Sequence, residues 1–140
     1  MSLERNKMIY RNFVEEVFNN GRLDLLETFL DPSYTNHDAP PGIPPGIEGV
    51  RQIVTMFRAA FPDLKISIEE QIAEGEKVCS LATTRGVHKG SIFGIPPTGK
   101  TIVMTGLTMV RIVNDKLMES WVKNDLMGLM SQLHGKPRSS

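Results

Sequence analysis

The sequence predicts an α+β fold: a cone formed by a strongly curved, mostly antiparallel sheet with N-terminal helices packed on its concave face. Three observations support this. Apolar residues recur at helical spacing up to residue 61, and from residue 64 onward they alternate with polar residues. Short turn signals then separate the strand segments, which favours consecutive antiparallel pairing. The apolar cavity of such a cone, with a few polar groups at its end, is a common ligand site.

Three helices are expected in the first half of the chain. The first should end at Asn19-Asn20-Gly21, the second at Asp31-Pro32 and the third at Pro62-Asp63. Between the second and third, residues 39–46 contain four prolines and two glycines, which predicts an ordered loop or a mobile flap. The apolar positions behind these helices are Met8, Ile9, Phe13, Val14, Val17, Phe18, Leu23, Leu26, Phe29, Val50, Ile53, Val54, Phe57 and Phe61.

The second half should form strands. Alternation from residue 64 to 68 predicts a first strand, and a turn at residues 74–77 leads into a second strand that ends at residue 88. A loop at 94–99 precedes a long strand over 101–113, and Asn114-Asp115 makes a tight turn into a last strand around Trp121. A short amphipathic helix from Leu126 should end at Gly135, with a frayed tail at 136–140.

Composition narrows the class of protein. The 140 residues are expected to form one domain, and 16 Lys and Arg balance 16 Asp and Glu, so nothing attracts the chain to nucleic acid or to an anionic membrane. The single Cys79 argues against disulfides, redox pairs and zinc sites. No apolar run is long enough for a membrane span or a signal peptide. We therefore expect a cytoplasmic protein that acts on a small molecule or on another protein.

One motif should be rejected. Residues 94–101 satisfy the P-loop pattern GxxxxGK[ST]. A P-loop needs a following helix and free backbone N–H groups, whereas here the next residues are β-branched and Pro96 and Pro97 remove two donors. The segment is interpreted as a loop that connects two strands.

The last strand carries the residues expected to do chemistry. Glu119, Trp121 and Asp125 share one face if the strand is regular, and a lone tryptophan is rarely found on a solvent-facing strand. That face should therefore look inward. A carboxylate beside the indole would lose water, and its pKa would rise toward the range useful for proton transfer.

Other polar residues in apolar surroundings allow ordinary structural interpretations. Asp125 could be the N-cap of the tail helix, and Glu119 could pair with Arg111 across the hairpin. His37 could simply end a loop, and His88 could bond a carbonyl in the core. Parity alone does not say whether Arg111 faces the cavity. No nucleophile has an adjacent base, and no cluster has metal-ligand spacing.

Several motifs together resemble the SnoaL-like polyketide cyclase (ester cyclase) family. They cover roughly residues 34–134, and only as an ordered set are they specific. The motifs are His37-Asp38-Ala-Pro-Pro-Gly-Ile-Pro-Pro-Gly-Ile-Glu-Gly49, Phe57-Arg-Ala-Ala-Phe-Pro-Asp63, Glu74-Gly75, Val87-His-Lys-Gly90, Gly94-Ile-Pro-Pro-Thr-Gly99, Glu119-x-Trp121-x-x-x-Asp125 and Leu129-Met-x-Gln-Leu133.

The resemblance implies the cone-shaped barrel of the nuclear transport factor two-like superfamily, and a homodimer formed through the sheet. It also implies ring closure of polyketide esters by intramolecular aldol condensation, without cofactor or metal. The family's acid/base aspartate falls on Asp125 and its pocket histidine on His88. Many members have Gly-Thr-His where this chain has Gly86-Val87-His88, and fold carries over better than reaction.

On this hypothesis Asp125 removes a proton alpha to a carbonyl and returns it to the new alkoxide, while His88 bonds the oxyanion or holds the carbonyl. Other residues would bind a small apolar or aromatic substrate: Trp121, His37, Phe57, Phe61, Phe13, Arg111 and Glu119. The alternatives are a non-catalytic binding protein with the same cavity, or a hydrolase, dehydratase or isomerase that uses the pocket, with His88 as base. A buried Asp125 facing the cavity would favour an enzyme, and an exposed Asp125 capping the helix would favour a binding protein.

Overall fold

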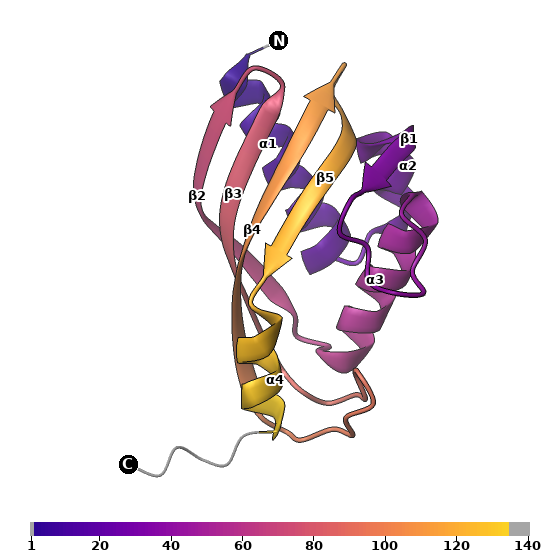
Figure 1. Ribbon diagram of the computed structural model, residues 1–140, viewed down its shortest axis with the longest axis vertical. Helices are drawn as coiled ribbons and strands as arrows, with labels where there is room; N and C mark the ends of the chain where they lie inside the picture. The colour runs from indigo at the N-terminus through magenta and orange to yellow at the C-terminus, as the bar shows by residue number, and fades with distance from the viewer. Residues whose placement is uncertain (1, 135–140) are drawn as a thin grey trace.

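The computed structural model describes residues 2–134, and it has the predicted α+β architecture (Figure 1). A π-helical segment (Val14–Asn19) directly continues the first helix, and a 3-10 turn (Leu23–Leu25) precedes the second. The predicted helix end at Gly135 and the tail 136–140 lie outside the described residues. The elements are α1 (Leu3–Phe13), α2 (Leu26–Phe29), β1 (Leu30–Asn36), α3 (Ile47–Ala60), β2 (Lys65–Glu74), β3 (Lys77–Val87), β4 (Thr101–Val113), β5 (Lys116–Asn124) and α4 (Leu126–His134).

The strands form one mixed sheet with the order β1-β5-β4-β3-β2. Strands β2 to β5 pair antiparallel in sequence order, and β1 joins the edge of β5 in the parallel direction. The sheet is curved but does not close into a complete barrel, and α1 and α3 lie on its concave side (Figure 1). The predicted α+β class is therefore confirmed, with an open sheet in place of a closed one.

Strand β1 was not predicted from the sequence, which placed a helix end at Asp31-Pro32. The structure ends α2 at Phe29 and continues with an extended segment that contains Pro32. Proline lacks an N–H and is tolerated only at sheet edges, which is where β1 lies. Its register with β5 is irregular between Leu30 and Thr35, so the local pattern of a strand is weak.

The predicted turns are confirmed. Asn114 and Asp115 have φ angles of 51° and 65°, as the two central residues of a type I′ hairpin require. The rejected P-loop segment is a connection between strands, since Thr101 begins β4 and not a helix.

Two clusters of buried apolar side chains fill the concave side. The first joins α1, the π-helical segment and α2 to the upper part of the sheet, with Phe13, Leu26 and Ile112 among its members. The second joins the end of α3 to α4 and to the connection between β3 and β4, around Phe61 and Leu129. Along β4 the even-numbered residues 102, 104, 110 and 112 are buried, so even parity marks the concave face of this strand.

No helix within residues 2–134 is long and apolar enough to cross a membrane. The cytoplasmic location expected from the single Cys79 stays a prediction.

Candidate functional site

The predicted site residues are divided between the two faces of the sheet. Strand pairing aligns Val110 with Ser120 and Met109 with Trp121, so Ser120 points to the concave face and Trp121 to the convex face. Ser120 is only 2% exposed. The expectation that Glu119 and Trp121 look inward is therefore wrong, because the helices cover the opposite face of this strand.

The convex face carries a cluster of charged and aromatic side chains. His37, which follows β1, stacks on Trp121 with ring centroids 4.8 Å apart and planes 18° apart. Its Nε2 lies 2.6 Å from Oε1 of Glu119, and Nε of Arg111 donates to Oε2 of Glu119 at 2.6 Å. Lys77 covers the indole, with Nζ 5.2 Å from the ring centroid. A lone tryptophan is thus accommodated on the outer face by polar neighbours.

The electrostatics of this cluster are opposite to the raised carboxyl pKa that was expected beside the indole. Hydrogen bonds from His37 and then from Arg111 lower the pKa of Glu119 from its ordinary range. Its carboxylate is therefore stabilised in the ionised form. The alternative interpretation, a cross-strand ion pair with Arg111, is confirmed, because the two residues are direct partners in the ladder.

Asp125 lies at the junction of β5 and α4. Its backbone N–H donates to the carbonyl of Thr105 at 2.9 Å, and its Oδ1 accepts from the N–H of Gly128 at 2.9 Å. The residue is exposed to solvent. Its side chain folds back over the first turn of α4 and lies close to Gly128. Any larger residue at position 128 would clash, because its Cβ would lie 2.2 Å from Oδ2 of Asp125. The N-cap interpretation is confirmed, and the expected dry hollow beside the indole is not found.

His88 is one of several buried polar residues, with 0% of its surface exposed. Its Nδ1 lies 3.1 Å from the backbone nitrogen of Thr98 and 2.9 Å from Oγ1 of the same residue. The prediction that the ring bonds a carbonyl in the core is therefore wrong. Within residues 2–134 the buried Nε2 has no hydrogen-bond partner. Leaving such a group unpaired costs about 1–3 kcal/mol, so its retention calls for an explanation.

A series of aromatic rings leads from His88 to the surface. The centroid of Phe61 lies 5.6 Å from that of His88, Phe57 stacks on Phe61 at 6.2 Å, and Phe93 meets Phe57 edge-on at 6.2 Å. Phe61 is fully buried, whereas Phe93 is 44% exposed. Phe13 belongs to the other core cluster and does not join this series.

Phe93 was not among the site residues predicted from the sequence. This residue stands at the tip of a tight turn closed by Ile92 and Ile95, and its φ of 52° is uncommon for a residue with a large side chain. The sequence signal was an aromatic residue before Gly94 in a loop between strands. Its strained backbone places a large apolar ring at the outer end of the aromatic series.

Buried hydroxyl groups were also missed. The hydroxyl of Tyr34 lies 2.5 Å from Oγ of Ser120, and that of Tyr10 bonds with Thr108. Burial raises the pKa of Tyr10 to about 12. Polar residues at concave-face parity in β4 and β5 were the available signal, and they give the interior several groups able to bond oxygen atoms of a ligand.

The structure does not bring Asp125 and His88 to one point. The backbone of His88 bonds Lys100, and that of Asp125 bonds Thr105. Lys100 and Thr105 are five residues apart along an extended segment, which corresponds to roughly 16 Å. Thr105 also has the odd parity of the convex face, whereas His88 is buried in the interior, so the two residues differ in the face of the sheet as well as in level.

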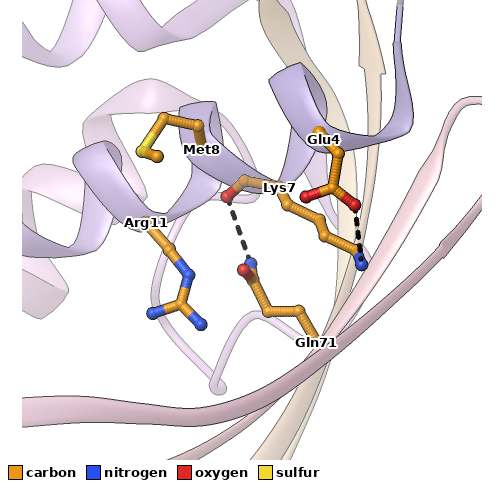
Figure 2. Close-up of a pocket in the computed structure, with 5 residues that line it drawn as sticks. All are labelled: Glu4, Lys7, Met8, Arg11 and Gln71. Carbon is orange, nitrogen blue, oxygen red and sulfur yellow. Dashed lines mark hydrogen bonds and ion pairs between the residues drawn. The ribbon is translucent and has the colours of Figure 1, made fainter.

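Two surface pockets lie along α1. One, of about 200 Å³, is lined by Glu4, Lys7, Met8, Arg11 and Gln71. Figure 2 shows Gln71 of β2 donating to the carbonyl of Lys7, and Lys7 pairing with Glu4. The other, of about 280 Å³, continues toward Asn19. Neither includes His88 or Asp125.

Comparison with known proteins places these features in a family context. The sequence profile of the SnoaL-like polyketide cyclase family matches residues 8–133. Nogalonic acid methyl ester cyclase of Streptomyces nogalater is 30% identical over 118 residues, which cover 83% of this chain and 88% of that protein. Aklanonic acid methyl ester cyclase DnrD of Streptomyces peucetius is 29% identical over 125 residues, covering 87% and 86% of the two chains.

Solved structures agree with this comparison. TsrD from Streptomyces laurentii superposes with a TM-score of 0.85 at 26% identity, over 95% of this chain and 97% of that one. The same fold thus extends over nearly the whole of both molecules.

Proposed function

The chain belongs to the SnoaL-like polyketide cyclase family, and on this basis we propose that it closes a ring in a polyketide-like ester by intramolecular aldol condensation, without a cofactor. The reaction is suggested by relatives that are named as methyl ester cyclases. The observation that carries the proposal is the buried Nε2 of His88, which lacks a partner beside a series of aromatic rings. An aromatic ligand with a carbonyl group matches both features.

In this proposal His88 holds one carbonyl of the substrate, and the aromatic series contacts its rings. Phe57 and Phe61 supply flat apolar surfaces, and Phe93 covers the outer end. A polar group that is buried and lacks a partner strongly prefers a ligand that satisfies it. His88 therefore orients the substrate, and proximity of the reacting carbons lowers the barrier.

Asp125 is proposed as the acid/base group at the other end of the substrate. It removes a proton from the carbon alpha to a carbonyl, and the resulting enolate carbon bonds to a ketone carbon of the same molecule. The alkoxide formed at that ketone then takes the proton back from Asp125. Since about 16 Å of strand separates the levels of His88 and Asp125, and Asp125 is exposed at the end of β5, this proposal requires an extended substrate that reaches from the interior to the end of that strand.

Replacement of Asp125 by Asn tests this mechanism. Asparagine caps helices as well as aspartate does, so D125N should keep its stability while losing the base. We expect turnover of an open-chain methyl ester to fall by a factor of about 100 or more. The matched control is D24N, since Asp24 is an exposed acid paired with Arg22 and remote from α4. Unchanged turnover in D125N would rule out the proposed base.

A second candidate function is binding without catalysis, and the position of Asp125 is the one that was expected of a binding protein. Asp125 is exposed and caps α4, and it lies far from His88 along the sheet. A binding protein would retain an aromatic ester unchanged, with the same affinity in D125N as in the native protein. Mass spectrometry of the ester after incubation separates this outcome from ring closure.

A second copy of the chain is the proposed partner, with the convex face as the contact. Leu81 and Leu107 are neighbours on β3 and β4, and they are 40% and 48% exposed. Glu70 and Lys123 stand at the two ends of the same row. A two-fold axis between the leucines would set Glu70 against Lys123 of the partner subunit, so the row is complementary to itself.

Light scattering during size-exclusion chromatography tests the homodimer. L107E should convert the dimer to a monomer, since it buries a charge in an apolar contact. M8E is the control, because Met8 is 55% exposed on α1, away from the convex face. A native monomer, or a dimer that persists in L107E, would contradict this interface.

A further inference from the structure

Thr98 determines which nitrogen of His88 carries the proton. A backbone N–H can only donate, so the N–H of Thr98, 3.1 Å from Nδ1, requires a lone pair on that nitrogen. A neutral imidazole with a lone pair on Nδ1 carries its proton on Nε2. Turning the ring over would place a carbon beside Thr98, and both bonds from this residue would be lost.

The position of Thr98 is itself fixed by the connection between β3 and β4. The N–H of His88 donates to the carbonyl of Lys100 at 2.8 Å, and the N–H of Gly99 donates to the carbonyl of His88 at 2.9 Å. The N–H of Lys100 reaches Oγ1 of Thr98 at 3.3 Å. Because the chain returns antiparallel to itself here, Thr98 cannot move away from the ring without breaking these bonds.

We infer that His88 is a fixed hydrogen-bond donor, held in that state by Thr98, and that its missing partner is a ligand oxygen that only accepts, such as a ketone or ester carbonyl. This deepens the proposed function and depends on it for the ligand. Nε2–H is buried and has no acceptor within residues 2–134, so the site rejects a group that cannot accept. Phe57 and Phe93 would have to shift to admit the carbonyl, as side chains commonly do on binding.

The same geometry removes one alternative for this protein. A base needs a free lone pair, but Nε2 carries the proton and the lone pair of Nδ1 is used by Thr98. His88 therefore does not serve as the base of a hydrolase or dehydratase. Thr98 is a positioning residue, since it acts through the histidine and not on the ligand.

Nitrogen NMR of the ligand-free protein tests the tautomer directly. The chain has three histidines, so the signals can be assigned with H37Q and H134Q variants. We expect His88 to show a protonated Nε2 and an unprotonated, hydrogen-bonded Nδ1. A proton on Nδ1, or an exchanging mixture of tautomers, would overturn the inference.

Two substitutions of Thr98 identify the group that fixes the tautomer. T98S keeps the hydroxyl and the backbone N–H, and T98V keeps only the N–H. Both should retain the proton on Nε2, with the Nδ1 signal shifted in T98V because one of its two bonds is lost. Appearance of the other tautomer in T98V would show that the backbone N–H does not fix the ring.

A matched pair of small probes tests the ligand class. 2-Acetylnaphthalene carries a ketone, and 2-ethylnaphthalene has a methylene in its place. We expect the ketone to bind roughly tenfold more tightly and to shift the Nε2–H signal, with the difference lost in H88F. Equal binding of the two probes would overturn the inference together with the carbonyl-holding role of His88, and ring closure with Asp125 as base would then be decided by the turnover of D125N. Binding of neither would contradict both, whereas loss of turnover in D125N bears only on the proposed function.

Discussion

The concave and convex faces of strands β3, β4 and β5 differ in how they accommodate polar groups. On the concave face, hydroxyls and His88 are buried, and each is held by a specific neighbour such as Ser120 or Thr98. On the convex face, charged groups keep contact with water and form pairs, as Glu119 does with Arg111. Alternating residues of the same strands therefore experience opposite environments.

This difference shows in the direction of the pKa shifts. Burial raises the pKa of Tyr10 and of Tyr34 on the concave side, because the charged form loses water. Hydrogen bonds from His37 and Arg111 lower the pKa of Glu119 on the convex side. Groups on the concave side should consequently lose their contribution to stability at alkaline pH, and Glu119 on the convex side should lose its contribution at acid pH. Substitutions on the two faces should also differ in how much they lower the free energy of unfolding.

The largest difference is expected for apolar side chains. F61A removes a ring that is 0% exposed, which should lower the free energy of unfolding by about 3–5 kcal/mol. L107A removes an exposed side chain of the convex face, and its loss should stay within about 0.5 kcal/mol for the monomer. Chemical denaturation at two protein concentrations measures both. A loss at Leu107 as large as at Phe61, and independent of concentration, would contradict the assignment of the two faces.

A smaller effect is expected at alkaline pH. The pKa of Tyr10 is raised to about 12, so the unfolded chain ionises first and the folded protein loses stability as pH rises from 10 toward 12. The loss should reach on the order of 2–3 kcal/mol. Unfolding curves of the native protein and of Y10F across this range measure it. Equal slopes in the two proteins would show that Tyr10 is not shielded from water.

The smallest effect belongs to Glu119. A lowered carboxyl pKa contributes stability that is fully present above pH 4.5, its ordinary value, and that disappears as pH falls through the folded-state pKa. The melting temperature of E119Q should therefore be lower than that of the native protein at neutral pH and equal to it in acid. E4Q, at an exposed residue of α1, is the control. A difference that persists in acid would contradict an ionic contribution.

Local patterns in the sequence predicted much of this structure. Helices, turns and most strands depend on spacing, on Gly and Pro, and on the two-residue turn at Asn114-Asp115, all of which act within a few residues. The same turn aligns Ile112 with Leu117, but an irregularity before Arg111 shifts the pairing by one residue. The ion pair of Arg111 with Glu119 was given in advance as an alternative, yet it depends on this shift and not on the turn alone. The N-cap role of Asp125 was likewise available, since it follows from the residue before a helix.

Other features depended on contacts between distant segments. β1 is stabilised by its partner β5, and Pro32 hides it from a local pattern. The hydrogen bonds of His88 Nδ1 come from Thr98, which lies ten residues later in the chain. Trp121 was assigned to the interior because of its type, yet His37 and Lys77, which approach from distant strands, cover it on the outer face.

The alternation of side chains within each regular stretch of strand was determined by the sequence alone, because it follows from backbone geometry with a period of two. The irregularity of β5, which leaves both Leu117 and Ser120 buried, was decided by pairing with β4. Which of the two sets faces the ligand was decided only by the tertiary structure. The two faces of a strand are equivalent until helices pack against one side of the sheet. That packing depends on the whole chain.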